Sequence, residues 1–299
     1  MNILITGTTG FLGKELVNQL SSNIIFKLNR NIGDYHYDLG NVAPIFQNSF
    51  DVVIHNAGKA HSVPKTNVEK EDFFKVNLGG TKNLLKGLET SIPNQFVFVS
   101  SVSVYGLDQG ERITENNDLL ARDPYGLSKI QAEKLVQEWC KQHKVVCTIL
   151  RLPLVVGSNP PGNLGAMIKG INKGYYFNIK GGRAKKSMVL AEDVGKFILK
   201  AAAVGGIYNL TDGYHPTFPE LSNHISSQLA KGKPMNMPLW LAKIIAKLGD
   251  LLGSKAPINT NKLNKITSDF TFDDSKARVA FGWNPTPVLE GFKIDPHAK

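Results

Sequence analysis

The sequence predicts a doubly wound α/β fold with a parallel sheet, and three observations support this fold class. Short apolar runs alternate with segments of helical periodicity through the first half of the chain, as in proteins built from βαβ units. The apolar runs are continuous rather than alternating, which is typical of strands buried on both faces. A glycine-rich turn directly follows the first run. Together these features indicate a dinucleotide-binding type of sheet.

The expected elements follow one another in a regular order. Each strand candidate is a short apolar run, and each helix candidate repeats its apolar residues at helical spacing. Glu192 and Asp193 add negative charge at the start of the last helix, which favours its N-terminus. The strand candidates are Asn2–Thr6, Ile24–Leu28, Val52–His55, Phe96–Ser100, Val146–Leu150 and Ile207–Leu210, and the helix candidates are Leu12–Leu20, Phe73–Leu88, Tyr125–Gln142 and Asp193–Ala203.

Two segments interrupt the alternation and predict a second, smaller part. Residues 157–190 are rich in Gly, Pro and Asn, and residues 214–299 contain mostly short helices and loops. We therefore expect a nucleotide-binding domain of residues 1–156 plus 191–213. Residues 157–190 plus 214–299 are expected to form a C-terminal substrate-binding lobe.

One segment of that lobe, Pro238–Leu252, has an amphipathic pattern. Its apolar side carries Leu239, Trp240, Ile244, Ile245, Leu248, Leu251 and Leu252, with Lys243 and Lys247 among them. Such a helix either buries its apolar face in the lobe or lies on a membrane surface. We favour the buried arrangement, because amphipathic helices are usually core elements.

Composition and charge exclude several classes of protein. The 299 residues are 42% hydrophobic and 20% charged, an ordinary globular composition. The formal net charge is +10, but the basic residues are dispersed, with Arg183–Lys186 the nearest approach to a cluster, so we do not expect nucleic-acid binding. No run approaches the ~20 apolar residues of a membrane span. No signal peptide is visible, and Cys140 and Cys147 are expected to be reduced packing thiols, so we expect a cytoplasmic protein without a metal site.

The turn Gly7–Gly13 predicts a phosphate-binding loop. Its three glycines follow a strand and open a helix, the context that makes such a pattern informative. Gly7 permits the tight turn, Gly10 allows the backbone to approach a pyrophosphate, and Gly13 lets the helix pack closely on the sheet. We therefore expect a Rossmann-type site for NADP(H) or NAD(H).

The end of the second strand bears on the choice between those cofactors. An acid there would hold the ribose 2′-hydroxyl of NAD, but the chain has Asn29-Arg30 instead. Arg30 either binds the 2′-phosphate of NADP or is a solvated turn residue. We lean towards NADP(H).

Tyr125 and Lys129 lie four residues apart on a predicted helix, so their side chains share one face. A nearby ammonium favours the phenolate, and the tyrosine would then exchange a proton close to neutral pH. The pair gains meaning from its position about two dozen residues after a strand that ends in two serines.

Several motifs in order make the chain similar to the extended short-chain dehydrogenase/reductase family, in its nucleotide-sugar epimerase/dehydratase group. The resemblance covers nearly the whole length and includes a closing helix and Gly-Trp-x-Pro turn of structural role. The matching stretches are Thr6–Gly13, Asp38-Leu39, His55–Gly58, Asn77–Thr81, Ser100–Gly106, Tyr125–Lys129, Arg151–Gly157, Phe272–Ala277 and Phe281–Pro285.

The resemblance implies a role for each matched position. Ser101 would hydrogen-bond the reacting oxygen, Tyr125 would be its acid or base, and Lys129 would lower the pKa of Tyr125 and bond the nicotinamide ribose. Asn77 would lie near the cofactor or a structural water, or else cap a helix, and His55 would be structural. The implied cofactor-binding residues are Gly7, Thr9, Gly10, Phe11, Leu12, Arg30, Asp38, Leu39, Asn56, Ala57, Gly58, Asn77, Ser100, Tyr125, Lys129, Leu152 and Pro153.

On the substrate side, the resemblance implies contacts from Ser101, Ser103 and Tyr125. Asn163 would bind the nucleotide, and Lys186 stands where the family often has an arginine that grips the diphosphate. Lysine keeps the charge but loses the two-pronged geometry. Arg183 and Lys185 are nearby candidates, and surface solvation is the alternative for all three basic residues. The family often has a late arginine that also clamps the phosphates. In this chain, residues 255–275 hold Lys255, Lys262 and Lys265 but no arginine.

These residues support hydride transfer at a sugar carbonyl or secondary alcohol. We place a 4-keto-sugar reductase first, because the acid is missing at Asn29-Arg30 and the connection from Leu28 to Asp38 is too short for a helix. A UDP-sugar C4 epimerase is the alternative. Dehydration is disfavoured, because Val102-Ser103 stand where an acid pair is needed. A non-catalytic NADP(H)-sensing scaffold is an option of another class. The expected substrate is a UDP- or dTDP-sugar.

The resemblance also implies a homodimer. The helices Phe73–Leu88 and Tyr125–Gln142 would pair across it. The apolar residues suited to that interface are Leu84, Leu85, Leu88, Leu135, Val136 and Trp139.

Overall fold

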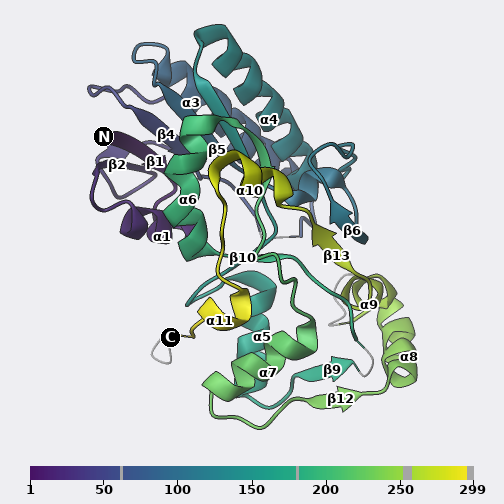
Figure 1. Cartoon of the computed structure of the whole chain (residues 1–299). Coiled ribbons are helices and arrows are strands. Elements are labelled where there is room, and N and C mark those ends of the chain that lie inside the picture. The colour runs from purple at the N-terminus through teal and green to yellow at the C-terminus, as the bar shows by residue number, and fades with distance from the viewer. Residues whose placement is uncertain (61–62, 180–181, 252–257, 295–299) are drawn as a thin grey trace.

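The computed structural model describes residues 1–60, 63–179, 182–251 and 258–294. It contains a seven-stranded parallel sheet in the order β11-β7-β5-β4-β1-β2-β3. Figure 1 shows this sheet between two layers of helices, with a smaller lobe beyond it. The strands are β1 Asn2–Thr6, β2 Ile24–Asn29, β3 Tyr35–His36, β4 Val52–His55, β5 Gln95–Ser101, β7 Val146–Leu152 and β11 Gly206–Asn209. The predicted fold class is confirmed.

Helices cover both faces of the sheet, as the continuous apolar strands require. On one face, α1 (Phe11–Gln19), α6 (Ala191–Val204) and α10 (Ser275–Phe281) pack on the strands around Ile5 and Leu150. On the other face, α3 (Gly80–Leu88) and α4 (Pro124–His143) pack around Phe96 and Ile149. These two clusters form the core of the domain.

The helix predicted at Phe73–Leu88 is interrupted. It consists of α2 (Asn67–Phe73), a π-helical segment η1 (Phe74–Gly79) and α3. A π-helical turn inside a helix is rare and is frequent at functional sites. Asn77 lies within this segment, so the alternative role of Asn77 as a helix cap is wrong, and its place near the cofactor stays a prediction.

The apolar residues suggested for a dimer interface are used within the single chain. Leu84, Leu85 and Leu88 on α3 are buried, as are Val136 and Trp139 on α4, all in the core cluster of that sheet face. Leu135 is half-buried and packs against the same cluster, so all six residues contribute to the core of the single chain. The homodimer stays a prediction.

The lobe gathers around a core of its own, which includes Leu164, Met188 and Ile225. Three small parallel pairs lie in the lobe or join it to the other domain, β8 with β10, β9 with β12 and β6 with β13. The helices of the lobe are α5 Gly162–Asn172, α7 Phe218–Gln228, α8 Leu239–Asp250, α9 Thr260–Thr267 and α11 Val288–Gly291, and the short strands of the three pairs are β6 Gly110–Ile113, β8 Leu154–Val156, β9 Phe177–Ile179, β10 Met188–Leu190, β12 Met235–Met237 and β13 Phe270–Phe272. Of these strands, β6 and β8 lie outside the residues expected for the lobe, 157–190 plus 214–299. Among the helices of the described ranges, none has the length and apolarity to cross a bilayer.

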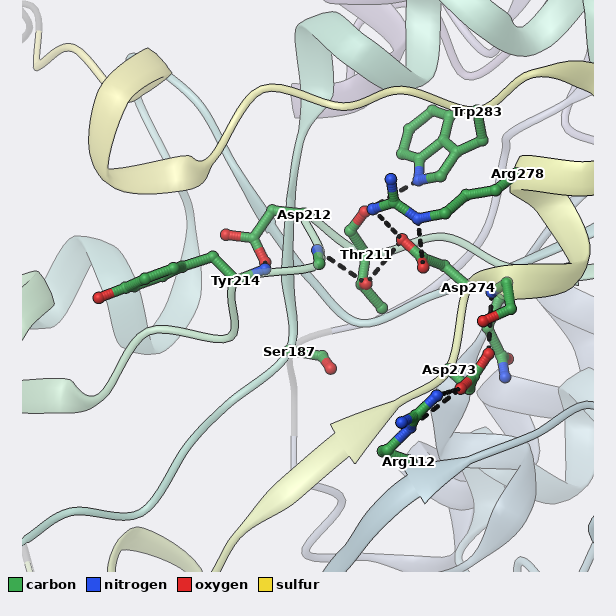
Figure 2. A network of polar contacts seen from close by, with 12 residues as sticks. Arg112, Ser187, Thr211, Asp212, Tyr214, Asp273, Asp274, Arg278 and Trp283 are labelled. Carbon is green, nitrogen blue, oxygen red and sulfur yellow. Dashed lines mark hydrogen bonds and ion pairs between the residues drawn. The ribbon is translucent and has the colours of Figure 1, made fainter.

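A polar network ties the end of the chain to the end of β11 (Figure 2). The Trp283 indole donates to the carbonyl of Thr211, 2.9 Å away. The Thr211 hydroxyl donates to Asp274, whose carboxylate also pairs with Arg278 at 2.8 Å. Arg112 of β6 pairs with Asp273 at 2.6 Å. The closing helix and Gly-Trp-x-Pro turn therefore fasten lobe and sheet, although α10 itself packs in the sheet's core.

Candidate active site

The glycine loop lies between β1 and α1 at the carboxyl end of the sheet. Gly7 has φ +70°, and a Cβ on it would come within 2.8 Å of the Ala57 Cα. A Cβ at Gly13 would lie 2.1 Å from the Gly7 carbonyl oxygen, so α1 sits directly on the loop. Gly10 caps α1 without any side chain, which leaves the first N–H groups of the helix to an anion. The loop fits the pyrophosphate of a dinucleotide.

The end of β2 faces this loop. The Asn29 amide donates to the Thr8 hydroxyl and to the carbonyl of Ile32, both at 2.7 Å. Its Oδ1 atom is buried and has no hydrogen-bond partner among the described residues. That atom is an acceptor suited to a ribose hydroxyl. Arg30 and Asp38 are exposed, while Leu39 is buried and its carbonyl accepts from Asn83.

His55 at the end of β4 organises the turn that follows. Thr81 donates its hydroxyl hydrogen to the carbonyl of Asn77, so it accepts from the Nε2–H of His55 at 2.9 Å. The Nδ1 atom then accepts from the Thr6 hydroxyl at 2.8 Å. Burial, with the nearby charge of Lys129, lowers the pKa of His55 to about 3. The ring is thus a neutral structural element.

The same Thr6 oxygen holds the turn against the glycine loop. It accepts the backbone N–H groups of Asn56 and Ala57 at 3.1 and 2.9 Å, and the Asn56 amide donates to the Gly7 carbonyl at 3.2 Å. Gly58 is exposed beside this turn. The predicted residues Gly7, Asn56, Ala57 and Gly58 therefore come together.

Ser101 ends β5 and caps the short 3-10 helix η2 (Val102–Tyr105). Its Oγ accepts the N–H of Ser103 at 3.2 Å and donates to the Ser103 hydroxyl at 3.1 Å. The neighbouring Ser100 is buried, and its hydroxyl donates to Glu133 at 2.5 Å. Ser101 therefore faces the site, whereas the Ser100 side chain, predicted to bind the cofactor, is committed to the core.

Tyr125 lies in the first turn of α4, close to η2. Asp123 caps the helix by accepting the Gly126 N–H at 3.0 Å, and Pro124 follows with its fixed φ. A Cβ at Gly126 would come within 2.8 Å of the Ser103 carbonyl oxygen, so only glycine permits this approach. Burial raises the pKa of Tyr125, and a hydrogen bond with Ser101 opposes that rise.

Lys129 lies one turn further along α4 and is buried. Its ammonium donates to the carbonyl of Val99 at 2.8 Å and lies 4.6 Å from the Phe98 ring centre. Burial lowers its pKa to about 8, against the opposing charge of Glu133. That Lys129 lowers the pKa of Tyr125 stays a prediction.

Asn77 links α4 to the turn after β4. Its Oδ1 accepts the N–H of Lys59 at 2.7 Å, and its Nδ2 donates to the Lys59 carbonyl and to Ser128 at 3.1 and 2.9 Å. Ser128 in turn donates to the carbonyl of Tyr125. The sequence did not indicate Ser128, because a buried serine in a helix carries no distinctive pattern.

Glu133 is a second residue that sequence reasoning missed. It accepts from Ser100 and forms a buried ion pair with Arg151, whose Nη2 lies 2.7 Å from Oε2. Arg151 also donates to the Tyr105 hydroxyl, which donates to Asn209. This chain of bonds braces β5, β7, β11 and α4 directly behind the site. The apolar pattern around Glu133 gave no signal for it.

The segment that follows β7 lies at the same carboxyl end of the sheet as the glycine loop. Leu152 is buried, and a Cβ at Gly157 would lie 3.0 Å from the Phe11 ring. Phe11, the first residue of α1, therefore contacts the strand that leads into the lobe. Pro153, which lies between Leu152 and Gly157 in the sequence, is half-buried.

Two predicted substrate residues, Asn163 and Lys186, belong to the lobe and differ in their surroundings. Asn163 is exposed at the start of α5. Lys186 is buried, and its ammonium donates to the carbonyls of Lys265 and Ser268 at 2.6 Å each. Burial lowers its pKa to about 8. The Lys186 charge is therefore already engaged by the C-terminal end of α9.

Two cavities open on the lobe, and neither is lined by Ser101, Tyr125 or Lys129. One, of about 420 Å³, is lined by Arg183, Lys185, Tyr214, His215 and neighbours. The other, of about 500 Å³, lies along the network of Figure 2 and shares Lys185 and His215 with it. Arg183 and Lys185, the nearby basic candidates, therefore face cavities of the lobe.

The chain is similar to known proteins over most of its length. The model of the NAD dependent epimerase/dehydratase family matches residues 3–211. A UDP-glucose 4-epimerase of Vibrio cholerae is 28% identical over 98% of this chain and 93% of its own length. The N-acetyl-alpha-D-glucosaminyl-diphospho-ditrans,octacis-undecaprenol 4-epimerase of Escherichia coli O157:H7 is 26% identical over 97% and 92%.

Among solved structures, RMD from Pseudomonas aeruginosa, in complex with NADPH, superposes with a TM-score of 0.74. The alignment covers 97% of this chain and 96% of that one, at 20% identity. This likeness shows the fold.

Proposed function

The chain belongs to the NAD dependent epimerase/dehydratase family, and from this premise we propose that it is a C4 epimerase of a hexose carried on a diphosphate. The observation that carries the proposal is the packing of the start of α4, which holds Tyr125 and Lys129, on the end of β5 beside Ser101: a Cβ at Gly126 would lie 2.8 Å from the Ser103 carbonyl oxygen, and Lys129 donates to the Val99 carbonyl. Two relatives that align over nearly the whole chain are 4-epimerases. They support epimerisation better than the 4-keto reduction placed first from the sequence.

Each residue of the site has a separate role in the proposed epimerisation. A bound nicotinamide supplies the oxidising and reducing power at the sugar carbon. Tyr125 removes the proton of the C4 hydroxyl and returns it to the carbonyl oxygen, which Ser101 holds by a hydrogen bond. Lys129, fixed on the Val99 carbonyl, adds positive charge where ribose hydroxyls would lie. Asn77 and Ser128 position the start of α4.

We propose NAD(H) as the working cofactor, within the NAD(H)-or-NADP(H) specificity of the family and its fold. The buried Oδ1 of Asn29 suits a free ribose hydroxyl, whereas a 2′-phosphate would bring negative charge against that acceptor oxygen. We expect NAD to bind more tightly than NADP in a titration followed by calorimetry. Tighter NADP binding would instead assign the 2′-phosphate to the exposed Arg30.

The epimerase assignment has a direct test. Purified protein incubated with UDP-glucose or UDP-N-acetylglucosamine, with no cofactor added, should yield the C4 epimer, because an epimerase regenerates its cofactor in every cycle. Product is followed by proton NMR of the anomeric region. If the protein converts only a 4-keto sugar and consumes NADPH stoichiometrically, the 4-keto-sugar reductase assignment would be correct instead.

Ser101 gives a further prediction for the same reaction. Its hydrogen bond lowers the Tyr125 pKa that burial raises, so Ser101→Ala should move the rising limb of the kcat/KM profile to higher pH. At neutral pH the rate should fall by about 10²-fold. Ser227→Ala, which removes the hydroxyl of an exposed serine on α7, is the matched control. An unshifted profile in Ser101→Ala would place Ser101 outside the proton transfer.

The carrier of the sugar is a nucleotide in one relative and a polyprenyl diphosphate in the other. Both present a diphosphate next to the sugar. A nucleotide sugar, in the cytoplasm, is the simpler assignment, and we keep the lobe of residues 157–190 plus 214–299 as its proposed binding region. The non-catalytic scaffold is disfavoured, because Ser101, Tyr125 and Lys129 are all present at one edge of the sheet.

A further inference from the structure

Helix α8 is built the opposite way from an ordinary lobe helix. Its small residues Ala242, Ala246 and Gly249 face inward, where Ala242 and Ala246 pack with Leu263 of α9. Its large apolar residues face outward. The sequence favoured burial of that apolar face, and the structure contradicts this; Leu252 of the same segment lies outside the described residues.

The outward side chains form one continuous strip, which we call the α8 strip. Its members are spaced four, four and three residues apart and so share one side of the helix. They are Trp240, Ile244, Leu248 and Leu251, exposed by 64, 49, 61 and 84%. An exposed strip of this size is costly in water and marks a contact surface.

The strip continues onto the small sheet that precedes the helix. Met235 of β12 and Phe177 of β9 are register partners, and they are 66 and 42% exposed. Figure 1 shows β9 and β12 next to α8 at one end of the lobe, so exposed apolar residues of this small sheet lie in the neighbourhood of the strip.

The charged residues beside the α8 strip indicate the kind of partner that it binds. Lys243 and Lys247 are exposed and lie along one edge of the strip, and Lys231 and Lys233 are exposed just before β12. Asp250, the one acid of α8, accepts the N–H and hydroxyl of Thr260 and so caps α9. The surface therefore combines large apolar side chains, a tryptophan and lysines, the combination of a helix that lies in an anionic bilayer interface.

We propose that α8, with β12, docks the protein on an anionic membrane surface. A second copy of the chain is a poorer occupant, because symmetric pairing of two such strips would bring the lysine edges together. The apolar strip would enter the headgroup region while Lys243 and Lys247 meet lipid phosphates.

Docking also bears on the carrier, and this step rests on the proposed function. Helix α9 lies between the strip and the Lys186 ammonium, since α8 packs on Leu263 and Lys186 donates to the carbonyls of Lys265 and Ser268. A membrane-docked α8 would hold this part of the lobe at the bilayer. A sugar on a lipid diphosphate would then reach the site from the bilayer surface, as a second carrier beside the nucleotide sugar assigned above.

Trp240 provides the test of docking. The other two tryptophans, Trp139 and Trp283, are only 7 and 2% exposed. Phosphatidylcholine vesicles containing phosphatidylglycerol should therefore shift the tryptophan emission to the blue, and the shift should vanish in Trp240→Phe. The full chain should also co-sediment with these vesicles. Absence of both effects would overturn the proposal, as would a concentration-dependent dimer lost in Ile244→Ser/Leu248→Ser.

Matched variants separate the surface from general charge and apolarity. Lys243→Glu/Lys247→Glu should weaken vesicle affinity by more than about thirtyfold, which is the effect of losing the two lysines before the added carboxylates are counted. Lys82→Glu/Lys86→Glu, with the same spacing on exposed positions of α3, should leave it unchanged. Leu248→Ser should weaken binding, while Val279→Ser, 89% exposed on α10, should not. Equal losses in the control variants would contradict a dedicated surface.

Turnover of a polyprenyl-diphosphate-linked N-acetylhexosamine in the same vesicles tests the carrier. Lys243→Glu/Lys247→Glu should lose this turnover while keeping any activity on the UDP-sugar. Equal turnover in variant and parent would overturn the link between docking and substrate. Vesicle binding without epimerisation of either substrate would refute the proposed function and leave docking intact.

Discussion

Replacing Tyr125 by Phe is expected to reduce turnover by about 10²- to 10⁴-fold, the usual contribution of a positioned acid–base group. The substitution removes only the phenol oxygen, and the ring keeps its place 6.0 Å from the Phe73 ring centre. Because the glycine loop, the His55 turn and Lys129 are untouched, cofactor affinity should stay nearly the same. Rate is measured by conversion of the C4 epimers and affinity by calorimetry with NAD.

Two comparisons make that result specific. Tyr175→Phe removes a hydroxyl from an exposed tyrosine of the lobe and should leave the rate unchanged. Lys129→Met should lower the rate and also weaken cofactor binding. Unchanged turnover in Tyr125→Phe would mean that another group moves the proton. No turnover in the parent protein on any diphosphosugar, together with intact cofactor binding, would support the scaffold.

The parts of the fold that the sequence predicted are those specified locally. The run Asn2–Thr6, the glycines that follow and the helix from Phe11 each carry their own pattern, so β1, the loop and α1 lie where expected. The pair Tyr125 and Lys129 was equally visible, because helical spacing alone places both on one face. Motif and element coincide at these positions.

The parts that the sequence did not predict depend on distant partners. Leu154–Val156 becomes a strand only because Met188–Leu190 returns beside it. The π-helical turn at Asn77 and the ion pair of Glu133 with Arg151 are likewise products of packing. For α8, periodicity correctly gave an amphipathic helix, but it could not tell which face meets the protein. Small residues inward and large ones outward reversed the usual assignment.

The buried His55 predicts marked sensitivity to acid. In the folded chain its pKa is about 3, against an ordinary value of 6.5. Between these values the unfolded chain binds a proton that the folded chain does not, so stability falls as pH drops through 6.5 towards 3. The full difference corresponds to about 4–5 kcal/mol, of which roughly 2–3 kcal/mol should be lost by pH 4.5. The cause is burial: a charged imidazolium at this position would lose its hydration, and the two threonine hydroxyls that bond the ring carry no negative charge to compensate.

His55→Gln isolates this contribution. A glutamine amide can accept from Thr6 and donate to Thr81 without titrating, so the variant should unfold in urea with little change between pH 7 and pH 4.5 where the parent loses stability. The difference between parent and variant, followed across pH, removes the other acidic and histidine groups from the comparison. His36→Gln, at an exposed histidine, should keep the parent's pH dependence. A parent and a His55→Gln variant with parallel pH profiles would mean that the His55 pKa is not lowered in the folded protein, and a charged ring would then donate from Nδ1 to the Thr6 hydroxyl as well as from Nε2 to Thr81.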